Sequence, residues 1–251
     1  MDKHLFALYL ENLSNLIYNL KKNQTFELAD KSLHNRLTRV LRLKENEQFV
    51  LFDKNLNTKL SLNSQTFENT KKIYITIKEI NKNKALEPEV IFCPSLLKKN
   101  AFEEIIYTAA QMGANVIQPV ITEKVQRKWG GEKERERLQK IMICACEQSK
   151  NFVMPVLHDP IELEVFLKKS DSKNSKKILF DDSGKPILDL LKNLNKQQKL
   201  FLMFGPEGGF SEKEIELIKV AGFVAYALTP TILRSVDAVI LGLGCVASVV
   251  R

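Results

Sequence analysis

Residues 202–214 read LMFGPEGGFSEKE, an apolar run followed by a glycine-rich turn and a polar stretch. Ser211 suits a helix N-cap, and Glu214, three residues on, completes a capping box, which predicts that a helix begins here. The glycines lack a Cβ, so the backbone of the turn can come close to a ligand. Because ligands of open α/β sheets bind beyond the carboxyl ends of strands, the turn is a candidate binding site.

Two phosphate-binding turns are excluded by spacing. The P-loop requires Gly-x-x-x-x-Gly-Lys-Ser/Thr, and the lysine is missing here. The Gly-x-Gly-x-x-Gly spacing of dinucleotide-binding folds is also absent. A plain tight connection between a strand and a helix stays open as the alternative. The binding-site interpretation is supported by residues 227–238, ALTPTILRSVDA, which again predict a strand end, a turn and a helix start.

The chain from residue 89 onward alternates apolar runs with longer amphipathic stretches, which predicts a parallel α/β sheet. A polar loop is expected at residues 172–177. The predicted strands cover residues 90–92, 116–121, 152–157, 178–180, 200–204 and 223–228. The predicted helices cover residues 99–112, 133–149, 186–195, 211–221 and 233–250.

The N-terminal part differs. Short alternating runs at residues 48–52, 59–62 and 73–80 predict half-buried strands of a small barrel or sheet, with one helix at residues 31–41. Lysine and asparagine crowd residues 81–84, and Pro88 follows, which is typical of a linker. We therefore expect two domains, residues 1–82 and 83–251.

Composition narrows the class of protein. A formal charge of +8, from 38 Lys and Arg against 30 Asp and Glu, favours a polyanionic partner such as nucleic acid, although a generally lysine-rich proteome is an equal alternative. The four cysteines and three histidines form no zinc or disulfide pattern, so no metal is expected. The first residues lack a signal-peptide layout and no apolar run reaches about 20 residues, so we expect a cytoplasmic chain without a membrane span.

The two C-terminal strings together resemble the 16S rRNA uracil-N3 methyltransferases of the SPOUT (α/β-knot) superfamily. Three upstream segments are similar to the same family: HNRLTRVLRL at residues 34–43, AAQMG at 109–113 and RLQKIMICACEQS at 137–149. The resemblance thus runs from about residue 34 to the C-terminus. The chain departs from the family pattern at Thr229, Thr231, Val236 and Asn151, and Asp237 carries a carboxylate that the family places one residue earlier.

The resemblance implies a C-terminal domain with a trefoil knot that binds S-adenosylmethionine, a PUA-like N-terminal β-barrel that binds RNA, and a homodimer. It implies 16S rRNA or the small ribosomal subunit as the partner. Arg234 is then the candidate catalytic residue, as a cation that stabilises an anionic uracil, with a plain ion pair as the alternative. The implied cofactor-binding residues are Phe204, Gly205, Pro206, Glu207, Gly208, Gly209, Leu228, Thr229, Ile232 and Leu233. A branched side chain at Gly208 is expected to block binding.

Basic side chains supply candidates for RNA contact. Arg36, Arg39 and Arg42 recur at helical spacing and predict one basic face. Lys124, Arg127 and Lys128 precede Trp129, a combination that suits phosphate contact with base stacking. For each group, a solvated surface is the alternative.

Two other functions stay open. A related knotted methyltransferase could act on a ribose 2′-hydroxyl or on another base. A protein that kept the fold but lost catalysis could bind RNA in ribosome assembly, and the replacements at Thr231 and Val236 favour this reading.

Overall fold

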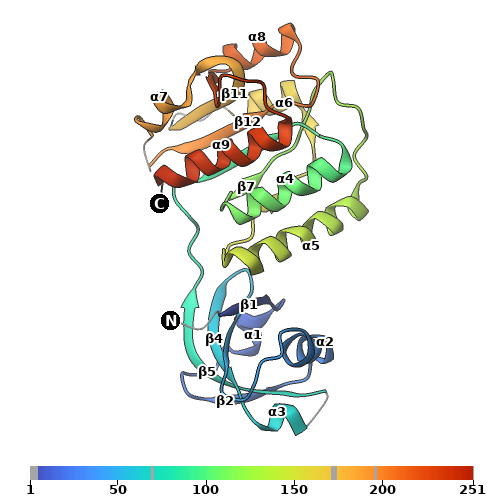
Figure 1. Cartoon of the computed structure of the whole chain (residues 1–251), viewed down its shortest axis with the longest axis vertical. Coiled ribbons are helices and arrows are strands. Elements are labelled where there is room, and N and C mark those ends of the chain that lie inside the picture. Colours follow the sequence, from blue (N-terminus) through green and yellow to red (C-terminus); the bar gives the residue numbers. More distant parts are fainter. Residues whose placement is uncertain (1–4, 69–70, 171–173, 195–196, 251) are drawn as a thin grey trace. The chain divides into compact units, whose positions relative to one another are not determined.

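The computed structural model describes residues 5–68, 71–170, 174–194 and 197–250 (Figure 1). The chain divides into two compact units after Lys84, close to the expected linker. Each unit has its own hydrophobic core. None of the described helices is long and apolar enough to cross a membrane.

The first unit is a mixed sheet. Within the described residues its strand order is β1-β3-β4-β5-β2, with β1 parallel to β3 and the other pairs antiparallel. Alternate residues of the long strands, such as Ile73, Ile75 and Ile77, are fully buried, as the period of two predicts. The strands are β1 (Phe6–Tyr9), β2 (Thr25–Leu28), β3 (Gln48–Phe52), β4 (Leu56–Leu62) and β5 (Ile73–Lys82), and the short helices are α1 (Leu13–Leu16), α2 (Lys31–Asn35) and α3 (Gln65–Glu68).

The helix expected at residues 31–41 is present but changes geometry. After α2 the chain continues as a π-helix, η1 (Arg36–Val40), and Arg42 lies beyond its end with a left-handed φ of 52°. The prediction of one helical face through Arg36, Arg39 and Arg42 is therefore wrong for Arg42. Val40, the last residue of this π-helix, is 72% exposed.

The second unit contains the predicted parallel sheet, with the order β13-β11-β12-β6-β7-β9 among the described strands. The inner strand β12 is buried except at its first residue, Lys199, because helices cover both faces of a parallel sheet. The strands are β6 (Val90–Pro94), β7 (Val116–Ile117), β9 (Val156–Leu157), β11 (Ser175–Pro186), β12 (Lys199–Phe204) and β13 (Val224–Ala227), and β8 (Val120–Ile121) pairs separately with β10 (Ile161–Glu162).

Two helical layers enclose this sheet (Figure 1). On one face α6 and α8 bury Phe166 and Ile218 against Phe201 and Met203. The opposite face carries α9, which packs beside α4, and α4 in turn packs on α5. The helices are α4 (Lys99–Gln111), α5 (Glu132–Ser149), α6 (Leu163–Lys169), α7 (Ile187–Leu191), α8 (Glu212–Val220) and α9 (Ser235–Val250).

The polar loop expected at residues 172–177 is wrong from Ser175 onward, where β11 already begins, whereas residues 172 and 173 lie outside the described part. Lys176 and Lys177 enter the strand because their backbones pair with β12 while their ammonium groups reach carbonyl oxygens of Asn193 and Ala221. Helix α6 was not predicted, and the expected strand at residues 116–121 is split into β7 and β8.

Candidate functional site

A cavity of about 560 Å³ opens beside the carboxyl end of β12. Its wall is built by five segments: the start of α4, the irregular part of β11, the turn after β12, the loop after β13 and the start of α9. The two strings singled out in the sequence therefore meet at one place, although a strand and a helix separate them along the chain. The position agrees with the general location of ligand sites in open α/β sheets.

Most of the predicted cofactor-binding residues lie on this wall. They are Phe204, Gly205, Pro206, Glu207, Gly209, Leu228, Thr229, Ile232 and Leu233, and Arg234 lines the cavity with them. Gly208 is not among the lining residues. A Cβ on Gly208 would meet the side chain of Lys124 at 3.3 Å, whereas a Cβ on Gly205 would meet the ring of Phe210 at 3.0 Å. A branched side chain is therefore expected to block the ligand at Gly205 and not at Gly208, because Gly205 and Phe210 both line the cavity.

The glycine-rich turn is held by contacts from three directions. Its own helix supplies the predicted capping box, in which Ser211 Oγ accepts from Glu214 N and Glu214 Oε2 accepts from Ser211 N. The same Glu214, buried, accepts a hydrogen bond from Glu123 N through Oε1 at 2.8 Å. Lys124 donates through Nζ to the carbonyl oxygens of Gly208 and Phe210 at 3.0 and 3.1 Å. These bonds fix the backbone of the turn before any ligand arrives, which lowers the entropy cost of binding.

The turn is also tied to the first residue before α4. Lys98 N donates to Glu207 Oε1 at 3.1 Å, although the two residues are 109 positions apart. Gly209 has a positive φ of 66°, a conformation that glycine adopts without strain.

The loop after β13 presents Arg234 at the start of α9. Its guanidinium makes a two-point ion pair with Asp237, at 2.8 Å for Nε–Oδ2 and 3.1 Å for Nη2–Oδ1. The hydrogen bonds with Asp237 raise the pKa of Arg234, the charge of nearby Glu104 raises it further, and the bond from Arg234 lowers the pKa of Asp237. The Arg234 side chain is 85% exposed, so it can reorient toward a bound substrate. Asp237, whose carboxylate lies one residue later than in the family pattern, is thus the ion-pair partner of Arg234.

All four departures from the family pattern take part in local contacts. Thr229 Oγ1 donates to Thr231 O at 2.6 Å and closes the loop, and Val236 lines the cavity. Asn151 donates through Nδ2 to Ala110 O and so ties the end of α5 to α4.

Several cavity residues were missed. Asp181 and Asp182 follow the apolar run at residues 178–180, so the rule that sites lie at strand ends could have found them. Asn100, Ala101 and Glu104 lie on α4, and no local signal distinguishes them from an ordinary helix face. The described residues contain no group of three or more His, Cys, Asp or Glu side chains that could hold a metal ion.

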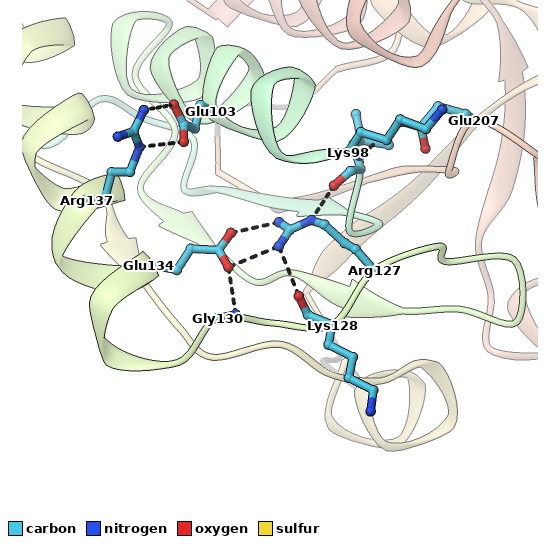
Figure 2. Close-up of polar contacts among 9 residues, drawn as sticks. Lys98, Glu103, Arg127, Lys128, Gly130, Glu134, Arg137 and Glu207 are labelled. Carbon is cyan, nitrogen blue, oxygen red and sulfur yellow. Dashed lines mark hydrogen bonds and ion pairs between the residues drawn. The ribbon is translucent and has the colours of Figure 1, made fainter.

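The second group of RNA candidates divides. Lys124 donates a hydrogen bond to the glycine-rich turn, and Lys128 is exposed. Arg127 points into the domain, where its guanidinium stands 5.0 Å from the Phe102 ring centroid and pairs with Glu134 at 2.8 Å (Figure 2). Trp129 packs edge-on against Phe102 with ring centroids 6.4 Å apart. Arg127 and Trp129 therefore have structural partners that their sequence spacing did not reveal.

The fold and the cavity together define an α/β domain built to bind a ligand at its strand ends. Residues 84–247 match the family described as RNA methyltransferase domain, which assigns the class of protein.

The chain belongs, within that class, to the ribosomal RNA small subunit methyltransferase E family. The protein of this name from Buchnera aphidicola is 30% identical over 246 residues, which cover 96% of this chain and 94% of that protein. The one from Synechocystis is 32% identical over 171 residues, and that match spans only 55% of its length. A structure of the Neisseria gonorrhoeae enzyme bound to S-adenosyl methionine superposes over 98% of both chains, with a TM-score of 0.78 and 27% identity. The resemblance recognised in the sequence is thereby confirmed.

Proposed function

We propose that this protein transfers a methyl group from S-adenosylmethionine to N3 of a uridine in 16S rRNA. The observation that carries the proposal is the meeting of residues 205–209 and 228–234 on the wall of one cavity. The similar Neisseria gonorrhoeae enzyme holds S-adenosyl methionine, and the curated relatives act on small-subunit ribosomal RNA by name.

The cavity suits the cofactor in size and chemistry. Its volume of about 560 Å³ lies within the usual range for small-molecule sites. Apolar side chains of Phe204, Leu228 and Leu233 offer a surface for the adenine ring, and the carboxylates of Glu104 and Glu207 favour a cationic ligand. S-adenosylmethionine supplies a methyl group on a positively charged sulfonium, which reacts with an in-line nucleophile.

Arg234 is suited to assist the nucleophile. Uridine N3 carries a weakly acidic proton that passes to solvent water before attack, which leaves the ring anionic; N3 then takes the methyl group and S-adenosylhomocysteine is released. A guanidinium on the cavity wall stabilises that negative charge. Asp237 holds the guanidinium by two hydrogen bonds until the substrate competes for it.

The direct test is nucleoside mass spectrometry of 16S rRNA from a strain that lacks the protein, combined with calorimetry of S-adenosylmethionine binding. Loss of 3-methyluridine and its return on adding the purified protein and the cofactor are expected. Loss of a 2′-O-methylated nucleoside or another methylated base would instead assign a different target atom. Unchanged rRNA together with no cofactor binding would favour the non-catalytic assembly protein.

For RNA contact we propose Arg36, Arg39 and Arg42 of the first unit as separate phosphate contacts, with Arg42 off the helical face that the sequence predicts. Lys128, exposed in the second unit, is a further candidate of its own. Changing the three arginines to glutamine is expected to weaken binding to a 16S fragment and to make its salt dependence shallower, by roughly 0.7–0.9 in slope for each lost phosphate contact. Cofactor affinity should stay the same, because the cavity is built entirely by the second unit. A salt titration of RNA binding measures the slope.

The matched control changes Lys192, Lys213 and Lys219 to glutamine, which removes the same charge from exposed positions on and next to α7 and α8. A wild-type slope in the arginine variant, or an equal loss in the control, would show that the arginines only contribute general charge.

We also propose that the chain forms a homodimer through α9. Its outer side has a groove of about 510 Å³ with a mainly apolar wall, formed by Leu233, Asp237, Ile240, Leu241, Gly244, Cys245 and Ser248. Exposed apolar surface of this kind is typical of an interface. Light scattering at micromolar concentration is expected to give twice the mass of one chain, and Leu241→Glu to give a monomer. Val220→Glu, on exposed α8, should leave the dimer intact; a monomeric wild type would exclude the interface.

A further inference from the structure

Arg127 makes four polar contacts around one point next to α4. Its Nε donates to Leu97 O at 2.5 Å, and Nη1 donates to Lys128 O at 3.3 Å and to Glu134 Oε2 at 3.0 Å. Its Nη2 lies 2.8 Å from Glu134 Oε1, and the two side chains are only 17% and 10% exposed. The two hydrogen bonds from Nη1 and the ion pair at Nη2 together restrict the rotation of the guanidinium and therefore the direction of its Nε–H.

The Leu97 carbonyl and the Lys98 N–H belong to the same peptide group. Arg127 Nε donates to the Leu97 oxygen of this peptide group. The Lys98 N–H of the same group donates to Glu207 Oε1 at 3.1 Å. Because a peptide group is planar, fixing the direction of its oxygen also fixes the direction of its N–H. Figure 2 shows Lys98 between Arg127 and Glu207. One peptide thus links a largely buried guanidinium to a carboxylate of the glycine-rich turn on the cavity wall.

We infer that Arg127 is a positioning residue that fixes the Glu207 carboxylate on the cavity wall through the Leu97–Lys98 peptide, so that it favours the cationic cofactor. The inference rests on the proposed function and deepens it. S-adenosylmethionine carries a positive charge at sulfur that S-adenosylhomocysteine lacks, so a correctly placed carboxylate favours the methyl donor over the product. Arg127 acts without touching either ligand.

The loss of charge alone predicts the opposite change in the affinity for S-adenosylmethionine. Removing the positive charge of Arg127 would, by Coulomb's law alone, strengthen the binding of a cation. Weaker binding of S-adenosylmethionine after that removal therefore reports the geometry of Glu207 and not the lost charge. A general loosening of the domain would weaken both ligands by the same factor.

The experiment measures the Kd of both ligands by calorimetry and the amide exchange of Lys98 by NMR, on the full chain. Arg127→Gln is expected to weaken S-adenosylmethionine about tenfold and S-adenosylhomocysteine clearly less, with faster Lys98 exchange. Arg127→Lys keeps a charge for Glu134 and protects the fold, but one ammonium cannot replace the planar donor set, so a similar loss is expected. Adding Glu207→Gln to Arg127→Gln should cause little further loss.

Arg137→Gln is the matched control. Arg137 joins α5 to α4 by a two-point pair with Glu103, at 2.6 and 2.8 Å, and not through the Leu97–Lys98 peptide (Figure 2). Both Kd values and the Lys98 exchange should stay within about twofold of wild type.

Three results would overturn the inference. The first is wild-type cofactor affinity and Lys98 exchange in both Arg127 variants. The second is an equal loss for the two ligands that adds to the effect of Glu207→Gln. The third is a shallower salt slope for RNA with unchanged cofactor affinity, which would make Arg127 a phosphate contact. If the wild type binds neither ligand, the proposed function fails, and the Lys98 exchange rates alone decide whether Arg127 holds the peptide.

Discussion

Gly205→Val is expected to weaken the binding of S-adenosylmethionine by roughly 10–100-fold. Even the first carbon of a side chain at this position would stand 3.0 Å from one Phe210 ring carbon and 3.2 Å from another. Both residues line the cavity, so the ring must move into the space that we assign to the cofactor, or the turn must shift away from it. Lys124 and Glu214 hold the turn in place, which makes the second route costly. Calorimetric titration with the cofactor measures the loss.

Gly208→Val is the comparison. An added Cβ there meets Cδ and Cβ of Lys124 at 3.3 and 3.5 Å, and Lys124 lies outside the cavity lining, so a shift of a few tenths of an ångström does not enter the cavity. A loss of no more than about threefold is expected, provided that circular dichroism shows both variants folded. If Gly208→Val were the more damaging change, the ligand would approach the turn from the side of Lys124, and the cavity assignment would have to be abandoned.

Arg234→Ala is expected to lower the single-turnover rate of RNA methylation by about 100-fold, with little change in the affinity for cofactor. The arginine lies on the cavity wall at the start of α9, where its charge can stabilise the uracil anion. Asp237→Asn removes the partner but keeps the guanidinium, so a smaller loss is expected. Equal rates in Arg234→Ala and wild type would reduce Arg234 to a surface ion pair with Asp237.

The pH dependence of the same rate separates the chemical role from a structural one. A cation beside the uracil lowers the pKa of N3, so the wild-type rate should level off at a lower pH than the rate of Arg234→Ala. The deficit of the variant is therefore expected to shrink as the pH rises. A variant that is merely misfolded would lose the same factor at every pH.

Local interactions explain why much of the second unit could be predicted. The capping box of Ser211 and Glu214 forms as its spacing indicates, because both bonds lie within one helical turn. The apolar run before it becomes β12, buried on both faces as a parallel strand must be. Helices α4, α5, α8 and α9 begin and end within a few residues of the predicted limits, since their amphipathic period is read directly from neighbouring positions.

The arginines show where local reasoning stops. Arg36, Arg39 and Arg42 have helical spacing, but a π-helix and a left-handed residue take Arg42 off the predicted face. Arg127 lies in a basic segment that suits RNA, yet its partners are Glu134, seven residues on, and the Leu97 carbonyl, 30 residues back. Charge and spacing do not tell whether a side chain turns inward, because that depends on which distant groups need its hydrogen bonds.

By itself the sequence determined the family, the alternation of strands and helices and the two strings that approach the ligand, because each depends on residue types within one short segment. Only the tertiary structure decided that these strings share a cavity with the start of α4, and that Gly205 faces Phe210 while Gly208 faces Lys124. It alone also placed one peptide between Arg127 and Glu207. Such contacts join positions up to 109 residues apart, and the order of the strands in the sheet brings them together.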